Sequence, residues 1–126
     1  MKTNAFVIAV DVENKFGVLT RVTSMFTRRG FNIDALTVGE TEHPEYSRIT
    51  ISLSGDGYAR EQLINQLRKL INVRKVEVLM DDSIKRELML IKIKYDSTTR
   101  ADVLSAVDVY RAKVIDYTSD AMCIEV

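Results

Sequence analysis

The chain has 126 residues, of which 46% are hydrophobic, and its 18 basic side chains balance its 18 acidic ones. A net charge near zero removes the long-range attraction that nucleic-acid-binding and membrane-surface proteins normally use, so neither kind of partner is expected. The single cysteine, Cys123, excludes an internal disulfide and a cysteine-cluster metal site. We expect a cytoplasmic location, because the sequence shows neither a signal-peptide core nor an apolar run of membrane-spanning length.

The spacing of apolar residues over 5–39 predicts a strand, a helix and a second strand. Residues 5–12 place Phe6, Ile8, Val10 and Val12 on one face of a strand. From Val18 the spacing becomes helical, and the apolar stripe consists of Val18, Leu19, Val22, Met25 and Phe26. Gly30 suits the position just past this helix, where the backbone often turns left-handed, and residues 32–39 follow as a strand.

Residues 40–80 predict a turn, a strand, a second helix and a last strand. The turn 40–46 contains Pro44, and residues 47–53 alternate as a half-buried strand. After a loop the helical stripe returns at Leu63, Ile64, Leu67, Leu70 and Ile71. Residues 73–80 form the fourth strand. The order β-α-β-β-α-β predicts a four-stranded antiparallel sheet with both helices on one face, which is a ferredoxin-like α+β domain over residues 1–80.

Residues 81–126 repeat the beginning of the same pattern. A charged joint, 81–87, leads into a strand at 88–95. Thr99 and Asp102 resemble a capping box. They open a helix whose apolar side carries Val103, Leu104, Val107 and Tyr110. Residues 113–118 and 121–126 then form a hairpin around Ser119 and Asp120. The order β-α-β-β predicts an incomplete second ferredoxin-like module over residues 81–126.

No group of residues in the sequence predicts catalysis or metal binding. The only histidine, His43, stands in a polar turn and is best explained as a solvated loop residue. Asp81, Asp82 and Glu87 favour a solvated joint over a pair of acid–base groups. Cys123 lies on a short apolar strand, which favours a small buried hydrophobe over a nucleophile. We therefore expect no catalytic residue and no metal site in this chain.

The segment ENKFGVLTRV, residues 13–22, is the strongest candidate for a binding site. A helix that begins near Val18 points unpaired N–H groups into the loop before it, where the backbone alone can bind a carboxylate. Gly17 leaves the approach to these groups open, although a glycine is equally typical of a simple turn or cap. The amides of Asn14 and Asn32 suit the polar ends of an amino acid. Apolar neighbours favour an aliphatic side chain on the ligand, and these are Val18, Leu19 and Ile33.

The longer stretch from Val12 to Ile51 resembles the N-terminal ACT domain of the regulatory (small) subunit of acetolactate synthase. The pattern is met at Asn14, Gly17, Leu19, Arg21, Val22, Phe26, Arg29, Gly30, Phe31, Asn32, Ile33, Leu36, Val38, Ser47, Arg48, Thr50 and Ile51. The G-x-L-x-R-V part is shared by many ACT domains, whereas RRGFNI and SRITI are much more specific. The likeness continues through QLRKLINVRKVEVL, KRELMLIKI and YRAKVIDYT, and so covers nearly the whole chain.

The resemblance implies a chain that is not an enzyme by itself. Members of this family bind and activate a separate catalytic subunit, which carries thiamine diphosphate, magnesium and FAD and condenses oxo acids in branched-chain amino acid synthesis. The small subunit confers feedback inhibition, usually by valine, and needs no cofactor of its own. The residues do not separate valine from leucine or isoleucine, because these ligands differ by little apolar volume.

The resemblance also implies a homodimer in which two ACT domains form one eight-stranded sheet. Valine binds at the interface, and the matching positions are Asn14, Gly17, Val18 and Leu19 from one chain with Asn32 and Ile33 from the other. The second domain departs from the family pattern, because its last helix and strand are missing. The alternative is a stand-alone ACT-domain sensor that regulates another enzyme or transcription, although no helix-turn-helix segment supports direct DNA binding.

Overall fold

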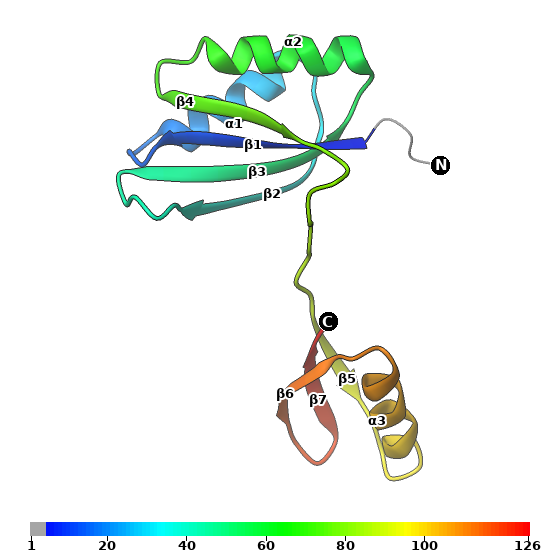
Figure 1. Ribbon diagram of the computed structural model, residues 1–126. Coiled ribbons are helices and arrows are strands. Elements are labelled where there is room, and N and C mark those ends of the chain that lie inside the picture. Colours follow the sequence, from blue (N-terminus) through cyan, green and yellow to red (C-terminus); the bar gives the residue numbers. More distant parts are fainter. Residues whose placement is uncertain (1–4) are drawn as a thin grey trace. The chain divides into compact units, whose positions relative to one another are not determined.

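The first part of the chain alternates strands and helices in the predicted order. The computed structural model describes residues 5–126 and contains two units, one within the stretch up to Ser83 and one spanning Ile84–Val126 (Figure 1). The first unit consists of β1 (Ala5–Glu13), α1 (Val18–Arg28), β2 (Ile33–Glu40), β3 (Tyr46–Ser54), α2 (Gly57–Arg68) and β4 (Val73–Leu79). This order confirms the predicted ferredoxin-like α+β fold.

The four strands form one antiparallel sheet in the order β2-β3-β1-β4. The register sets Ile8 opposite Ile51 and Val10 opposite Ile49, so these side chains share one face. They are fully buried in a cluster with residues of both helices, namely Val18, Val22, Met25, Phe26, Leu63, Ile64 and Leu67. Both helices therefore cover the same face of the sheet (Figure 1).

The C-terminal end of α1 is closed by a left-handed glycine, as predicted. Gly30 has a φ of 76°, and its N–H donates to the carbonyl of Thr27 at 3.2 Å. The next residue, Phe31, donates its N–H to the carbonyl of Phe26 at 3.0 Å, which completes a Schellman motif. The two phenylalanine rings meet edge to face with their centroids 6.3 Å apart. This contact fixes the direction in which the chain leaves the helix toward β2.

The second helix is shorter than its apolar spacing predicts. Asp56 caps its N-terminus, because the carboxylate accepts the N–H of Ala59 at 2.8 Å. The helix ends at Arg68, so the prediction that Ile71 belongs to the buried stripe is wrong, and this residue is 89% exposed. The cause is the chain direction, since β4 must begin at Val73 to pair with β1 and cannot follow another helical turn.

The second unit is a three-stranded sheet with one helix. Its elements are β5 (Leu90–Lys94), α3 (Arg100–Val109), β6 (Lys113–Tyr117) and β7 (Ala121–Glu125), and the sheet order is β5-β7-β6. This arrangement confirms the predicted incomplete module. Tyr95, Met122 and Ile124 are its buried apolar residues.

The apolar side of α3 is narrower than the sequence predicts. Val103 and Val107 pack on the sheet, whereas Leu104 and Tyr110 are exposed. The reason is that a single helix on a small sheet presents only one row of residues, spaced four apart, to the strands. Cys123 is half-buried rather than buried, because β7 alternates and only its even-numbered neighbours face the helix.

The cap of α3 lies one turn earlier than predicted. Thr99 is helical and makes no capping bond, so the proposed capping box with Asp102 is wrong. Instead the carboxylate of Asp96 accepts the N–H groups of Thr98 and Thr99, each at 2.9 Å, and the hydroxyl of Thr98 at 2.6 Å. These bonds, those from Thr98 first, lower the pKa of Asp96 to about 2.

We expect two glycine-to-alanine substitutions in the first unit to act in opposite directions. Gly30→Ala should lower the free energy of unfolding by about 1 kcal/mol, because alanine resists the left-handed backbone although its methyl group would meet no neighbour. Gly57→Ala, at the first residue of α2, should raise it by about 0.5 kcal/mol through helix propensity. Urea unfolding followed by circular dichroism measures both. Shifts of the same sign in both variants would contradict this account.

Candidate functional site

The loop between β1 and α1 places a left-handed glycine at the start of the helix. Gly17 is the N-cap residue, with φ 86° and ψ −6°, and it provides no side-chain cap. A β-carbon built on Gly17 would meet nothing within 4 Å. The backbone conformation therefore favours the glycine, and the space in front of it is open.

The first turn of α1 keeps unused hydrogen-bond donors. The N–H of Val18 donates to the carbonyl of Lys15 at 3.3 Å. Within residues 5–126, no carbonyl or side chain accepts the N–H of Leu19 or Thr20. Both residues are exposed. Two donors at the positive end of a helix dipole suit a carboxylate ligand.

One side of the loop is fixed by the turn between β2 and β3. The backbone N–H of Asn14 donates to the carbonyl of Glu45 at 2.8 Å. The side-chain Nδ2 of Asn14 donates to the carbonyl of Pro44 at 2.9 Å and to Oε2 of Glu40 at 3.3 Å. Asn14 therefore connects two segments that lie far apart in the sequence.

The other side of the loop is fixed by Asn72, between α2 and β4. Its carbonyl accepts the N–H of Glu13 at 3.0 Å, and its Nδ2 donates to Oε1 of Glu13 at 2.6 Å. Arg21 of α1 donates to Oδ1 of the same asparagine. The bond from Asn72 and the ion pair with Lys15, at 3.2 Å, lower the pKa of Glu13. The sequence analysis missed Asn72, because nothing near it in the sequence indicates this partner.

The six predicted effector residues fall at two opposite ends of the unit. Asn14, Gly17, Val18 and Leu19 lie together where β1 ends. Asn32 and Ile33 lie at the start of β2, where Ile33 pairs with Leu53 and so with the end of the sheet where β1 begins. The length of α1, roughly 16 Å, separates the two groups. A single chain does not bring the six residues together.

The apolar members of the predicted set differ in exposure. Val18 is packed in the core, whereas Leu19 is 40% exposed and Ile33 is half-buried. Only the latter two can offer apolar surface to a ligand without a rearrangement of the core.

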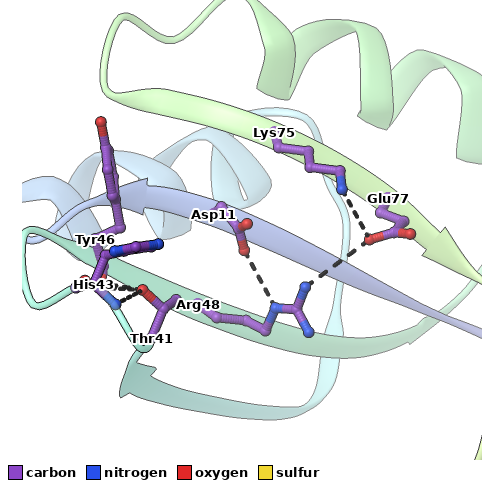
Figure 2. A network of polar contacts seen from close by, with 7 residues as sticks. All are labelled: Asp11, Thr41, His43, Tyr46, Arg48, Lys75 and Glu77. Carbon is purple, nitrogen blue, oxygen red and sulfur yellow. Dashed lines mark hydrogen bonds and ion pairs between the residues drawn. The ribbon is translucent and has the colours of Figure 1, made fainter.

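A second polar region lies on the face of the sheet opposite the helices. Arg48 bonds Asp11 at 3.2 Å and approaches Glu77 at 3.9 Å, and Lys75 approaches Glu77 at 3.8 Å (Figure 2). A hollow of about 620 Å³ borders this region and is lined by Asp11, Glu40, Thr41, Glu42, His43, Arg48, Arg74 and Lys75. The two cations of the network, Arg48 and Lys75, are balanced by the two carboxylates, Asp11 and Glu77, so these four groups together carry no net charge toward a ligand. His43 is exposed, as predicted.

The described residues 5–126 contain no group of three histidine, cysteine, aspartate or glutamate side chains placed to hold a metal ion. None of the helices in that range is long and apolar enough to cross a membrane.

Both units match family profiles of the acetolactate synthase small subunit. Residues 8–75 match the profile of the AHAS small subunit-like ACT domain, and residues 86–126 match that of the small subunit of acetolactate synthase. The acetolactate synthase small subunit of Mycolicibacterium smegmatis is 49% identical over 124 residues, which are 98% of this chain and 73% of that protein. A probable acetolactate synthase small subunit of Archaeoglobus fulgidus is 46% identical over 119 residues, or 94% of this chain and 75% of that protein.

Solved structures show the same family relationship. The crystal structure of the acetolactate synthase small subunit from Thermotoga maritima has a TM-score of 0.91 at 36% identity and covers 97% of this chain and 77% of its own. The ACT domain of a GTP pyrophosphokinase from Chlorobium tepidum has a TM-score of 0.55 at 18% identity, covers 66% of this chain and 91% of its own, and shares the fold alone.

The first unit has the fold of an ACT domain, with an open helix start in the loop between β1 and α1. The chain is therefore an ACT-domain protein. The match extends through the second unit and across most of the length of the relatives. The chain belongs to the family of acetolactate synthase small subunits.

We expect Asn72→Ala to raise the pKa of Glu13 toward its ordinary value, because the largest cause of the lowered pKa is lost. A lowered pKa means that the contact stabilises the loop above the unfolded-state pKa and is lost as the pH falls through the folded-state pKa. Titration of the Glu13 carboxyl carbon by NMR measures the change. Asn65→Ala, on an exposed position of α2, is the control. An unaltered Glu13 titration in Asn72→Ala would show that the side chain of Asn72 does not bind the Glu13 carboxylate.

Proposed function

We propose that this chain is the non-catalytic regulatory subunit of acetolactate synthase, acts in the cytoplasm, and confers feedback inhibition by valine. The family relationship supports the role, and one observation carries the effector site, namely the two unused N–H groups at the start of α1. Thiamine diphosphate, magnesium and FAD belong to the catalytic subunit in this proposal, and this chain carries no cofactor. Its task is to bind that subunit, raise its activity and reduce that activity when valine accumulates.

The proposal includes a homodimer that joins two ACT domains along β2. This strand is an edge of the sheet, since it pairs only with β3 within residues 5–126. Val38 on β2 is 45% exposed although it faces the helix side of the sheet. Edge strands with exposed apolar residues are ready to pair with another chain. Pairing of β2 with its copy would continue the sheet to eight strands.

Twofold symmetry then unites the two halves of the effector site. Two copies of β2 related by a twofold axis run antiparallel, so the start of one strand lies opposite the end of the other. The end of β2, Glu40, contacts Asn14. Asn32 and Ile33 of the partner subunit would therefore approach the loop that contains Gly17. This geometry supports a valine site shared by two chains.

The expected affinity is moderate. Burial of the valine side chain contributes about 1.5–3 kcal/mol, and hydrogen bonds to its carboxylate add about 1.5–3 kcal/mol. The sum, about 3–6 kcal/mol, corresponds to dissociation constants of roughly several millimolar to tens of micromolar, which suits a sensor of a metabolite pool.

Reconstitution tests the proposed role directly. The chain, mixed with the catalytic subunit of acetolactate synthase, should increase the rate of acetolactate formation, and valine should reduce that rate. The catalytic subunit alone is the control, and valine should leave its rate unchanged. Valine binding by this chain without any effect on the enzyme would instead favour a sensor that regulates another target.

Two substitutions at Gly17 separate charge from backbone strain. Gly17→Asp should weaken valine binding about tenfold or more, because a second carboxylate would compete for the helix N–H groups and repel the ligand. The asparagine of Gly17→Asn has almost the same shape as aspartate, tolerates a left-handed backbone and carries no charge. This variant should therefore lose much less affinity for valine than Gly17→Asp. Titration calorimetry measures both. Equal valine affinity in the wild type and in Gly17→Asp would refute the site.

A further inference from the structure

Glu40 places a carboxylate against the loop that leads into the helix proposed to bind the effector. It is the last residue of β2, and Asn14 donates to its Oε2 at 3.3 Å. Glu40 pairs in register with Ser47, which pairs with Val12, so its side chain lies on the helix-covered side of the sheet. The carboxylate and the start of α1 are therefore on the same side.

No basic side chain within residues 5–126 forms an ion pair with Glu40. The nearby cations have other partners. Arg48 bonds Asp11, and Lys75 approaches Glu77. The guanidinium of Arg74 lies 4.4 Å from the centre of the Tyr46 ring. Within the part of the chain that the structure describes, Glu40 therefore has no cationic partner.

The loop consequently offers two opposite polar features. The N–H groups of Leu19 and Thr20 present donors for an anion, and Glu40 presents an acceptor for a cation. An α-amino acid carries a carboxylate and an ammonium group on neighbouring atoms. Asn14 can release Glu40 at little cost, because its Nδ2 keeps the shorter bond to the carbonyl of Pro44 at 2.9 Å.

We propose that Glu40 binds the α-ammonium group of the effector, so that the site selects amino acids over carboxylic acids of the same shape. This inference rests on the proposed function, since it assigns a specificity residue to the same site. In the twofold dimer the partner subunit's Asn32 and Ile33 would cover the pair and exclude water from it, which strengthens a charged contact.

The experiment compares two ligands that differ only in the ammonium group, valine and isovalerate. Titration calorimetry on the full chain should show that the wild type binds valine about tenfold or more tightly than isovalerate. Equal binding of the two ligands by the wild type would overturn the inference without any variant. This arm does not depend on whether a substituted chain folds.

The variant arm uses Glu40→Gln, with Glu42→Gln as the matched control in the same turn. Glu40→Gln should weaken valine binding about tenfold to a hundredfold and leave isovalerate binding unchanged, while Glu42→Gln should match the wild type. Wild-type valine affinity in Glu40→Gln, together with lost affinity in Gly17→Asp, would overturn the role of Glu40 and leave the effector site standing. If the wild type binds neither ligand, the proposed function fails and this inference fails with it.

Discussion

The first unit is organised by β1, which is paired on both sides and packed on one face. Its neighbours are β3 and β4, and its alternation sends Ile8, Val10 and Val12 into the core beneath the helices. A shift of one residue would move all three to the polar face, so the register is strongly specified. Because β1 is fixed in this way, the point at which its chain leaves the sheet is fixed as well. The pairing of β1 therefore fixes the position and direction of the chain where the loop after Glu13 begins.

The loop after β1 inherits this constraint. The chain must turn from β1 into a helix that packs on the face of the sheet formed by Ile8, Val10 and Val12. It does so through four residues, 14–17, the last of which has a left-handed backbone. A glycine that satisfies the backbone cannot also cap the helix with a side chain. The exposed donors at the start of α1 are thus a by-product of the tight turn. Asn14 and Asn72 hold this tight connection from two sides, and the result is a polar surface at the edge of the core.

Local signals explain how much of this could be predicted from the sequence. Strand alternation and helical spacing depend on neighbours within a few residues, so the order of elements, the closing role of Gly30 and the ferredoxin-like fold were predictable. Strand alternation and helical spacing did not predict the structure at Ile71 and Thr99. The apolar stripe that includes Ile71 continues past the helix, and only the pairing of β4 with β1 determines where the helix must stop. At Thr99 the predicted cap makes no capping bond, because Asp96, three residues earlier, accepts the N–H groups of Thr98 and Thr99.

The loop proposed to bind the effector was predicted from Gly17, whereas its contacts with Asn72 and Glu40 were not. Both residues are distant from the loop in the sequence and come close to it only once the sheet is assembled. Their positions also bear on how such a site can act. Since the length of α1 keeps Asn32 and Ile33 away from Gly17 in one chain, a ligand that contacts both groups must contact two chains. Binding would then be coupled to the geometry and stability of the dimer by mass action, without any internal movement of the ACT fold. A ligand held within one chain would have no such coupling. In the proposed dimer, the separation of the two half-sites would couple effector binding to the interface between the chains, so that the signal would arise there rather than within one domain.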